Sequence, residues 1–469
     1  MKLIIRKNLV FILILLNSTI AISQDFSGTW SGKLQNQLTE LQLAFNIEKQ
    51  DAAYKGTMDS PSENISGIPL SNAVIDDSKV TFEISRLKIK YEGVLNKDGA
   101  LEGVFNQQGA KIPLVLSKKR GGDTPSKNNR PQEPIKPYTY ISEDVTFINN
   151  IDDVTLSGTL SLPDNNGKFP AVILISGSGP QNRDQEIAGH KPFLVISDYL
   201  VKKGIAVLRY DDRGFGKSSG DFSSADSYDF AQDAIAAVNF LKNRNQIDSN
   251  KIGIIGHSEG GLIAPIASNI SQSINFIVLM AAPSSSGDKI LLDQIRLQKN
   301  FTGLSETELG TELKTSKKVF DIIKNTKNEK KMVENLKSYL KSSIIKSQIP
   351  NHMTIDEFVE IQSKAMTSKW MQFFLKHNPV DELKKIKVPV LAINGTKDVQ
   401  MSFSHLNTIK DAITKSGNSN VSVKAFEGLN HLFQKCETGA ISEYMKIEQT
   451  ISPKVLETMS NWIKQVVYE

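Results

Sequence analysis

The residues best suited to chemistry form the pentapeptide Gly256-His257-Ser258-Glu259-Gly260. An apolar run typical of a β-strand ends here, and a helix-like run, 262–267, follows directly. A serine between glycines at such a strand-to-helix turn is raised above the end of a sheet, because side chains at the glycines would strike the adjoining backbone. We therefore predict that Ser258 is a nucleophile. The backbone N–H of Glu259 is then expected to face the oxyanion that its attack creates.

A serine hydroxyl needs a general base, and the base needs a carboxylate that orients it. On an elbow of this type the acid and then the histidine follow the serine along the chain. His431 comes after the last predicted strand, 421–426, and Asp398 comes after the preceding predicted strand, 388–393. Both residues thus belong to loops at the carboxyl ends of strands. We predict a triad of Ser258, Asp398 and His431.

The second oxyanion donor is expected in the glycine-rich turn Ser176-Gly177-Ser178-Gly179-Pro180, which follows a predicted strand at 169–175. Proline has no N–H, so the donor lies earlier in the turn, and we predict Ser178. Two other histidines are interpreted differently. His257 is adjacent to the nucleophile and cannot fold back onto its hydroxyl, and His405 lies in a predicted helix, 403–409, as a surface or packing residue.

The elements that must position these residues alternate between strands and helices. Further apolar strands are predicted at 204–210 and 276–280, helices at 193–203 and 227–243, and an opening hairpin at 145–148 and 156–162. This alternation implies right-handed crossovers and a mostly parallel sheet. Residues 287–378 show helical periodicity without a strand. We expect this segment, the cap, to lie over the strand carboxyl ends, where open sheets bind ligands; the alternative is a helical layer away from the site.

A different pattern precedes the α/β part. Residues 24–118 hold short alternating runs separated by Gly, Asn and Asp, which is typical of an antiparallel meander. We predict a small all-β domain, either a sandwich or a half-barrel, whose binding partner the sequence does not reveal. Residues 119–137 are rich in proline and are predicted to be a linker to a catalytic domain at 138–469.

The first residues resemble an export signal. Met1–Ser23 combine a basic start, an apolar run at 9–16 and small residues at 21–23, which predicts a cleaved signal peptide ending near Gln24. The alternative is an uncleaved N-terminal anchor. We expect a periplasmic or secreted protein without a stable membrane span after cleavage, since no other stretch is long and apolar enough. Cys436 is the single cysteine, so no intramolecular disulfide can form.

Composition excludes several functional classes. A net charge of +5 over 469 residues is too small for a nucleic-acid-binding footprint. The run Arg209–Ser218 ends in Gly-Lys-Ser, but Asp211 stands where a phosphate loop needs glycine, so we interpret the run as ion pairs that fix a turn. No metal-ligand spacing and no dinucleotide fingerprint is present. We therefore predict neither a metal nor a cofactor.

Four groups of residues together resemble the α/β-hydrolase superfamily, in particular exported bacterial serine esterases close to the serine aminopeptidase-like hydrolases. They are Ser176–Asp184, Arg209–Gly214, Gly256–Gly261, and Asn394–Asp398 with Asn430-His431. The resemblance covers 138–469 and implies an α/β-hydrolase sheet with a helical cap. It also implies a serine carboxylesterase that cleaves short-chain esters of small molecules through an acyl-enzyme. Two alternatives stay open: a serine peptidase acting on small peptides, and a non-catalytic exported binding protein.

Overall fold

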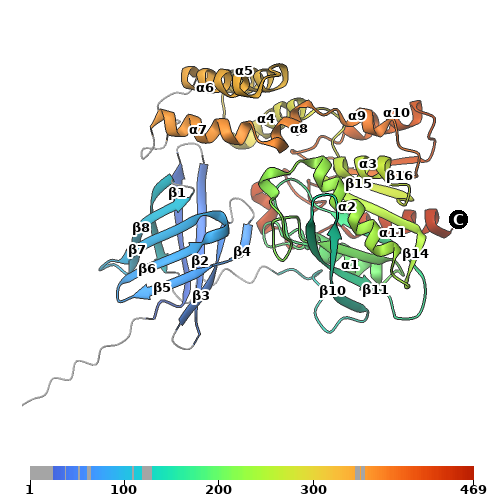
Figure 1. Cartoon of the computed structure of the whole chain (residues 1–469), viewed down its shortest axis with the longest axis horizontal. Coiled ribbons are helices and arrows are strands. Elements are labelled where there is room, and N and C mark those ends of the chain that lie inside the picture. Colours follow the sequence, from blue (N-terminus) through green and yellow to red (C-terminus); the bar gives the residue numbers. More distant parts are fainter. Residues whose placement is uncertain are drawn as a thin grey trace, which may run out of the picture.

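A computed structural model describes residues 25–468, apart from 37–38, 51–52, 61–64, 108–109, 119–128, 344–348 and 350–353. The predicted signal peptide, 1–23, lies outside the described residues, as do residues 119–128 of the predicted linker. Figure 1 shows three parts of the chain: an N-terminal β-sheet, an α/β part and a group of helices.

The N-terminal part is one curled antiparallel sheet, which confirms the predicted all-β domain in its half-barrel form. Glycines permit the curl: a Cβ on Gly32 would lie 2.1 Å from the carbonyl oxygen of Val115, and one on Gly56 would lie 2.3 Å from that of Asn46. The sheet order is β4-β3-β2-β1-β9-β8-β7-β6-β5. The strands are β1 (Gly28–Asn36), β2 (Thr39–Gln50), β3 (Ala53–Ser60), β4 (Ile65–Pro69), β5 (Asn72–Asp76), β6 (Lys79–Ile84), β7 (Ile89–Leu95), β8 (Ala100–Gln107) and β9 (Ala110–Lys118).

The second sheet is mostly parallel, as predicted. Its order is β10-β11-β13-β12-β14-β15-β16-β17, with β10 and β11 antiparallel and β12 to β17 parallel. The strand order reverses beside β12, so the loops that follow β12 and β14 open at the place where such sheets bind ligands. The strands are β10 (Ile141–Asn149), β11 (Val154–Leu162), β12 (Phe169–Ile175), β13 (Ala206–Tyr210), β14 (Ile247–His257), β15 (Phe276–Met280), β16 (Val390–Gly395) and β17 (Val421–Phe426).

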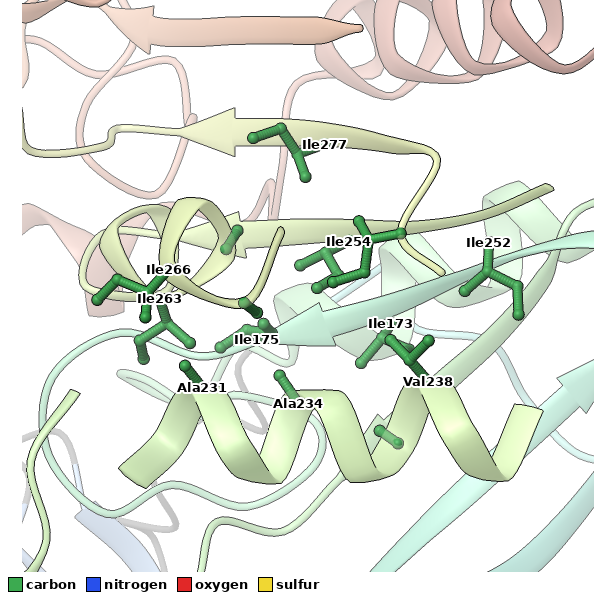
Figure 2. Close-up of a cluster of buried hydrophobic side chains, with 14 of the residues drawn as sticks. Ile173, Ile175, Ala231, Ala234, Val238, Ile252, Ile254, Ile263, Ile266 and Ile277 are labelled. Carbon is green, nitrogen blue, oxygen red and sulfur yellow. The ribbon is translucent and has the colours of Figure 1, made fainter. Parts of the chain in front are cut away.

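Helices cover both faces of this sheet because its central strands are apolar on both faces. Ile173 and Ile175 of β12 pack towards α2 (Ser227–Lys242) and α3 (Gly260–Ile270), as Figure 2 shows. Val172 and Leu174 of the same strand pack on the other face, towards α1 (Pro192–Val201) and α11 (Pro453–Tyr468). α10 (His405–Lys415) joins the first of these two cores through Leu406, Ile409 and Ile413.

The cap is helical, as predicted, and is inserted between β15 and β16. It comprises α4 (Gly287–Thr302), α5 (Glu306–Asn325), α6 (Glu329–Ser343), α7 (Ile355–Met366) and α8 (Lys369–Lys376), and α9 (Pro379–Leu383) leads back to the sheet. A small core of its own, which includes Phe320, Leu336 and Leu375, holds these helices together. Within the described residues, none of the helices is long and apolar enough to cross a membrane.

Candidate active site

Ser258 occupies a strained turn between β14 and α3. Its φ is +55°, a left-handed conformation that costs energy for any residue except glycine. The neighbouring glycines make the turn possible, because a Cβ on Gly256 would lie 2.0 Å from the carbonyl oxygen of Gly260. A Cβ on Gly260 would in turn lie 2.3 Å from the carbonyl oxygen of Ile175. The turn therefore presents the Ser258 hydroxyl beyond the end of the sheet.

Asp398 and His431 meet beside this turn. The Nδ1 atom of His431 lies 2.7 Å from Oδ2 of Asp398, and both side chains are buried. The other carboxylate oxygen accepts hydrogen bonds from the backbone N–H groups of Gln400 and Met401, each at 2.8 Å. These two bonds fix the carboxylate, and the carboxylate fixes the imidazole so that Nε2 is left to act as a base.

Ser258 and His431 line one cavity of about 420 Å³. Among the described side chains, none forms a hydrogen bond with the Ser258 hydroxyl, and the partner of the His431 imidazole is Asp398. Catalytic hydrogen bonds are often long in a free enzyme and tighten when substrate binds, so this geometry is compatible with a resting nucleophile.

His257 holds the backbone that carries His431, a role the sequence interpretation missed. Its Nε2–H donates to the carbonyl oxygen of His431 at 3.0 Å, and its Nδ1 accepts from the amide of Gln185 at 2.7 Å. Burial lowers the pKa of His257 to about 3, so the ring is neutral near pH 7 and keeps this donor and acceptor pattern. The only sequence signal for this contact was the polar residue next to the nucleophile.

The turn with the predicted oxyanion donor Ser178 runs beside Ser258. An ideal Cβ on Gly177 would lie 3.2 Å from Cβ of Ser258, so the two backbones approach closely. The Asp212 carboxyl group binds both ends of the turn: the Ser176 hydroxyl lies 3.0 and 3.1 Å from its oxygens, and the Gln181 N–H donates to it at 2.9 Å. Glu259 lies directly after Ser258, at the N-cap of α3.

The cavity is formed by loops of the sheet and by the cap. The cap contributes Leu291 and Gln294 from α4, and Trp370 and Phe374 from α8. The Trp370 and Phe374 rings stack at 5.0 Å with an angle of 9° between them. The remaining wall comes from residues 177–182, 185–187, 215, 400, 432, 441 and 444. The cap therefore supplies part of the substrate-facing surface.

Comparison with known proteins now decides the family. A model of the X-Pro dipeptidyl-peptidase (S15) family matches residues 152–421, which is more than half of the chain. This chain belongs to the S15 family. The match spans the elbow and Asp398 and ends at the start of β17, before His431.

Individual relatives of this S15-family chain include esterases. Esterase EstD of Thermotoga maritima is 25% identical over 384 residues, which cover 82% of this chain and 78% of EstD. An uncharacterized 31.7 kDa protein of Escherichia coli is 24% identical over 247 residues, covering 51% of this chain and 76% of that protein. A solved esterase of Pyrococcus furiosus aligns with a TM-score of 0.43 and 19% identity, over 70% of this chain and 91% of the esterase.

These findings confirm the resemblance to the α/β-hydrolase superfamily. The S15-family chain is a hydrolase that acts on esters or peptides. Within the described residues, no group of three or more His, Cys, Asp or Glu side chains is placed to hold a metal ion.

The Glu259 side chain connects the elbow of this S15-family protein to the cap. It is 4% exposed, and its Oε1 accepts hydrogen bonds from the Ser227 hydroxyl at 2.6 Å and the Trp370 indole at 2.7 Å. Burial raises the pKa of this carboxyl group. The sequence interpretation used only the backbone of Glu259 and did not anticipate that its carboxyl group reaches Trp370, 111 positions away.

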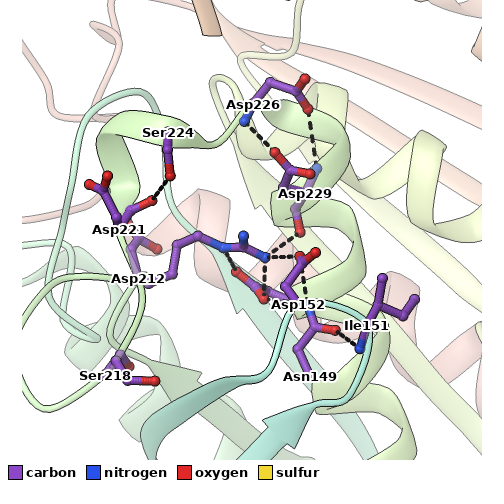
Figure 3. Close-up of polar contacts among 12 residues, drawn as sticks. Asn149, Ile151, Asp152, Asp212, Ser218, Asp221, Ser224, Asp226 and Asp229 are labelled. Atoms are coloured by element: carbon purple, nitrogen blue, oxygen red, sulfur yellow. Dashed lines mark hydrogen bonds and ion pairs between the residues drawn. The ribbon is translucent and has the colours of Figure 1, made fainter. Parts of the chain in front are cut away.

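The run Arg209–Ser218 of the S15-family chain forms ion pairs that fix its turn. Arg213 pairs with Asp233 at 2.7 Å and Asp152 at 2.8 Å, and Asp211 pairs with Arg183 at 2.9 Å. Figure 3 shows Asp152 and Asn149 together with the start of α2, where Asp226 and Asp229 form a capping box. This turn holds Asp212 in place below the oxyanion turn.

Residues at the end of the predicted linker bind the catalytic domain of this S15-family chain. The guanidinium of Arg130 donates to four carbonyl oxygens, of Gly189, Ala188, Met445 and Ile447, at 2.6–3.1 Å. These carbonyls belong to two loops that also carry the cavity residues Ile187, Ile441 and Tyr444. Arg130 therefore holds together two loops that form one wall of the site.

His405, which the sequence indicated to be a surface or packing residue, stands at the first residue of α10 and contacts Ser284. Its Nδ1 accepts hydrogen bonds from the backbone N–H of Ser284 at 2.9 Å and from the Ser284 hydroxyl at 2.7 Å. Burial lowers its pKa. His405 does not line the cavity that holds Ser258.

Proposed function

We propose that this chain is a serine carboxylesterase that cleaves short-chain esters through an acyl-enzyme intermediate. The observation that carries the proposal is the hydrogen-bonded pair of His431 and Asp398 on the same cavity as the strained Ser258. The cavity volume of about 420 Å³ is near the lower end of the range for small-molecule sites, which favours a small acyl group. The similarity to esterase EstD supports the same reaction.

Each residue then has one role. The Ser258 hydroxyl attacks the ester carbonyl while Nε2 of His431 accepts its proton, and the protonated imidazole then gives that proton to the leaving alcohol. Asp398 stabilises the imidazolium through the 2.7 Å contact at Nδ1. The backbone N–H groups of Ser178 and Glu259 stabilise the oxyanion. Water repeats the sequence and releases the acid.

The decisive assay compares esters and amides on the purified full chain. We expect hydrolysis of 4-nitrophenyl acetate and butyrate, a fall in kcat/KM with octanoate, and little hydrolysis of amino-acid nitroanilides. The Ser258→Ala variant should lose the ester activity while its circular dichroism is unchanged. A folded Ser258→Ala protein with near-normal activity would sink the mechanism.

Peptide hydrolysis is the second candidate, because the match to the X-Pro dipeptidyl-peptidase family favours it. The same triad can cleave an amide. An X-Pro dipeptide nitroanilide therefore belongs in the same assay. A kcat/KM for this substrate above that for 4-nitrophenyl acetate would replace the esterase by a peptidase.

We also propose export with removal of residues 1–23. The proposal is supported by the basic, apolar and small residues in that stretch. Mass spectrometry of the protein from its native cell should find an N-terminus near Gln24. An intact Met1 on the mature protein would contradict cleavage.

A further inference from the structure

The cavity carries a group of glutamine side chains with defined amide orientations. Gln181 donates from its amide to the carbonyl oxygen of Ser178 at 3.2 Å, Gln185 donates to His257 at 2.7 Å, and Gln294 donates to the carbonyl oxygen of Gln400 at 3.0 Å. A carbonyl oxygen and the Nδ1 of a neutral imidazole accept hydrogen bonds and cannot donate them. In each glutamine the amide nitrogen is thereby identified, and the amide oxygen is the group left for a ligand.

These amide oxygens receive no hydrogen bond from the described part of the chain. The Oε1 atom of Gln181 is shielded from solvent and has no hydrogen-bond partner among the described residues. A ligand gains this bond only where it can reach the oxygen, and Gln185 is 1% exposed. Gln294 is partly exposed on the same cavity, so its amide oxygen is the acceptor that the wall offers most directly.

The charged groups that line the cavity also favour a ligand without negative charge. The described lining residues include the carboxylate of Glu186 but no lysine or arginine. His257, on the same cavity, is neutral near pH 7 because burial lowers its pKa to about 3. Among the described lining residues there is therefore no permanently cationic side chain that would stabilise an anionic substituent. Substrates with carboxylate or phosphate groups near the ester are therefore disfavoured.

Apart from Gln294, the cap contributes apolar side chains to the cavity. The stacked rings of Trp370 and Phe374 lie there with Leu291. The indole N–H is already used by Glu259, so the ring offers mainly apolar surface. A saturated ring with several hydroxyl groups has both matching features: C–H groups that pack on aromatic surface, and O–H groups that donate to amide oxygens.

We propose that the substrate is a neutral, polyhydroxylated ester, such as an acylated sugar or polyol, whose hydroxyl groups donate to the glutamine oxygens of this cavity. This inference rests on the proposed esterase function. It adds the chemical class of the alcohol, which neither the family nor the relatives specify.

The test uses acetates on matched six-membered rings, with 4-nitrophenyl acetate as the measure of basal activity. The rings are methyl glucoside 6-acetate, cyclohexylmethyl acetate, and the cyclohexylmethyl acetates that carry one ammonium or one carboxylate group. One good neutral hydrogen bond corresponds to about threefold to tenfold in kcat/KM. We expect the glucoside to exceed the plain ring by about tenfold or more, and the carboxylate ester to be the slowest.

Variants assign the preference to this wall. Gln294→Leu should lower the ratio of glucoside to plain-ring kcat/KM by about threefold to tenfold. The matched control is Gln372→Leu on α8, because Gln372 donates to the carbonyl oxygen of Thr367 and does not line this cavity. Its ratio should equal that of the wild type.

The outcomes separate the two proposals. No hydrolysis of any ester, 4-nitrophenyl acetate included, would overturn the esterase function and this inference with it. Hydrolysis of 4-nitrophenyl acetate with equal kcat/KM for the glucoside and the plain ring would overturn the inference alone. A clear preference for the ammonium ring would overturn the neutral class and assign selectivity to the charge of Glu186.

Discussion

Replacing Asp212 tests whether its carboxyl group fixes the turn at 176–181, which carries the predicted oxyanion donor Ser178. Its carboxyl group contacts the hydroxyl of Ser176 at 3.0 and 3.1 Å and accepts from the N–H of Gln181 at 2.9 Å. Everything between these two residues, including the predicted donor Ser178, depends on this attachment. Asp212→Ala removes it without touching the triad.

The size of the effect follows from the lost bonds. Each shielded donor that is left unpaired costs about 1–3 kcal/mol, so Asp212→Ala should lower the free energy of unfolding by about 2–6 kcal/mol. Displacement of an oxyanion donor lowers kcat by up to about 10²–10³. KM should change little, because the ground-state ester carbonyl depends less on this donor than the transition state does.

Asp212→Asn should behave differently. Removal from water raises the pKa of Asp212 well above its usual value, and its oxygens accept from the Ser176 hydroxyl and the Gln181 N–H. The amide oxygen of an asparagine can accept in the same way, so this variant should keep most of the activity. Because the folded-state pKa is raised, the carboxyl contributes most to stability below its unfolded pKa of about 3.8, and this contribution is lost as the pH rises. The stability of Asp212→Asn relative to the wild type should therefore increase from pH 4 towards pH 8.

The assay is kcat and KM for 4-nitrophenyl acetate, together with the affinity for an arylboronic acid, whose adduct with Ser258 resembles the tetrahedral intermediate. Asp212→Ala should weaken the boronate more than it raises KM. Asn418→Ala is the control: it removes hydrogen bonds to the carbonyl oxygens of Ile386 and Val388, away from the cavity, so it should lower the melting temperature without weakening the boronate. Normal kcat and boronate affinity in a folded Asp212→Ala would refute the reasoning, and equal losses in the Asn and Ala variants would show that an amide oxygen cannot replace the carboxyl group here.

Three further predictions follow from the site. Ser258→Ala and His431→Ala should each reduce ester turnover by several orders of magnitude, and the double variant should reduce it little further, because the members of a triad act as one unit. His405→Ala should leave turnover nearly unchanged. Turnover is measured with circular dichroism as the folding control, and a loss confined to His405→Ala would identify a different base. Arg130→Ala should raise KM more than it lowers kcat, because it releases two loops of the cavity wall, and an unchanged KM would contradict that role. Limited proteolysis should first cut within the predicted linker, 119–137, and the larger fragment should keep its ester activity; a first cut inside 138–469 would contradict the separation of the domains.

The elements that were predicted best are those with a clear local pattern of apolar and turn-forming residues. The strands at 169–175, 276–280 and 421–426 have the predicted bounds. Short apolar runs bounded by Gly, Pro or Asn are typical of buried strands in α/β proteins. The start of β14 was missed: the strand begins at Ile247, and its polar residues 248–250 carry no strand pattern. The loop positions of Asp398 and His431 were predictable for a related reason, since each follows a recognisable strand.

Contacts between distant side chains and backbone could not be predicted. Arg130 donates to carbonyl groups 58 and 317 positions away in the chain. Nothing in the sequence distinguishes Arg130 from other residues with long donor side chains. The same holds for Gln185, which contacts His257 from 72 positions away. Such bonds depend on where the loops meet, which only the folded chain defines.

The elbow illustrates how much positioning one short motif can perform. Ser258 is the proposed nucleophile, and the side chains of His257 and Glu259 on either side of it contact different parts of the site. His257 binds the carbonyl oxygen of His431, so the base is tied to the strand that carries the nucleophile. Glu259 binds the indole of Trp370, so the cap wall is tied to the helix that follows. A shift of the elbow would therefore move base, nucleophile and cap wall together, which preserves their mutual geometry. This coupling gives a physical reason for polar residues at 257 and 259, where the turn itself requires only small neighbours at 256 and 260.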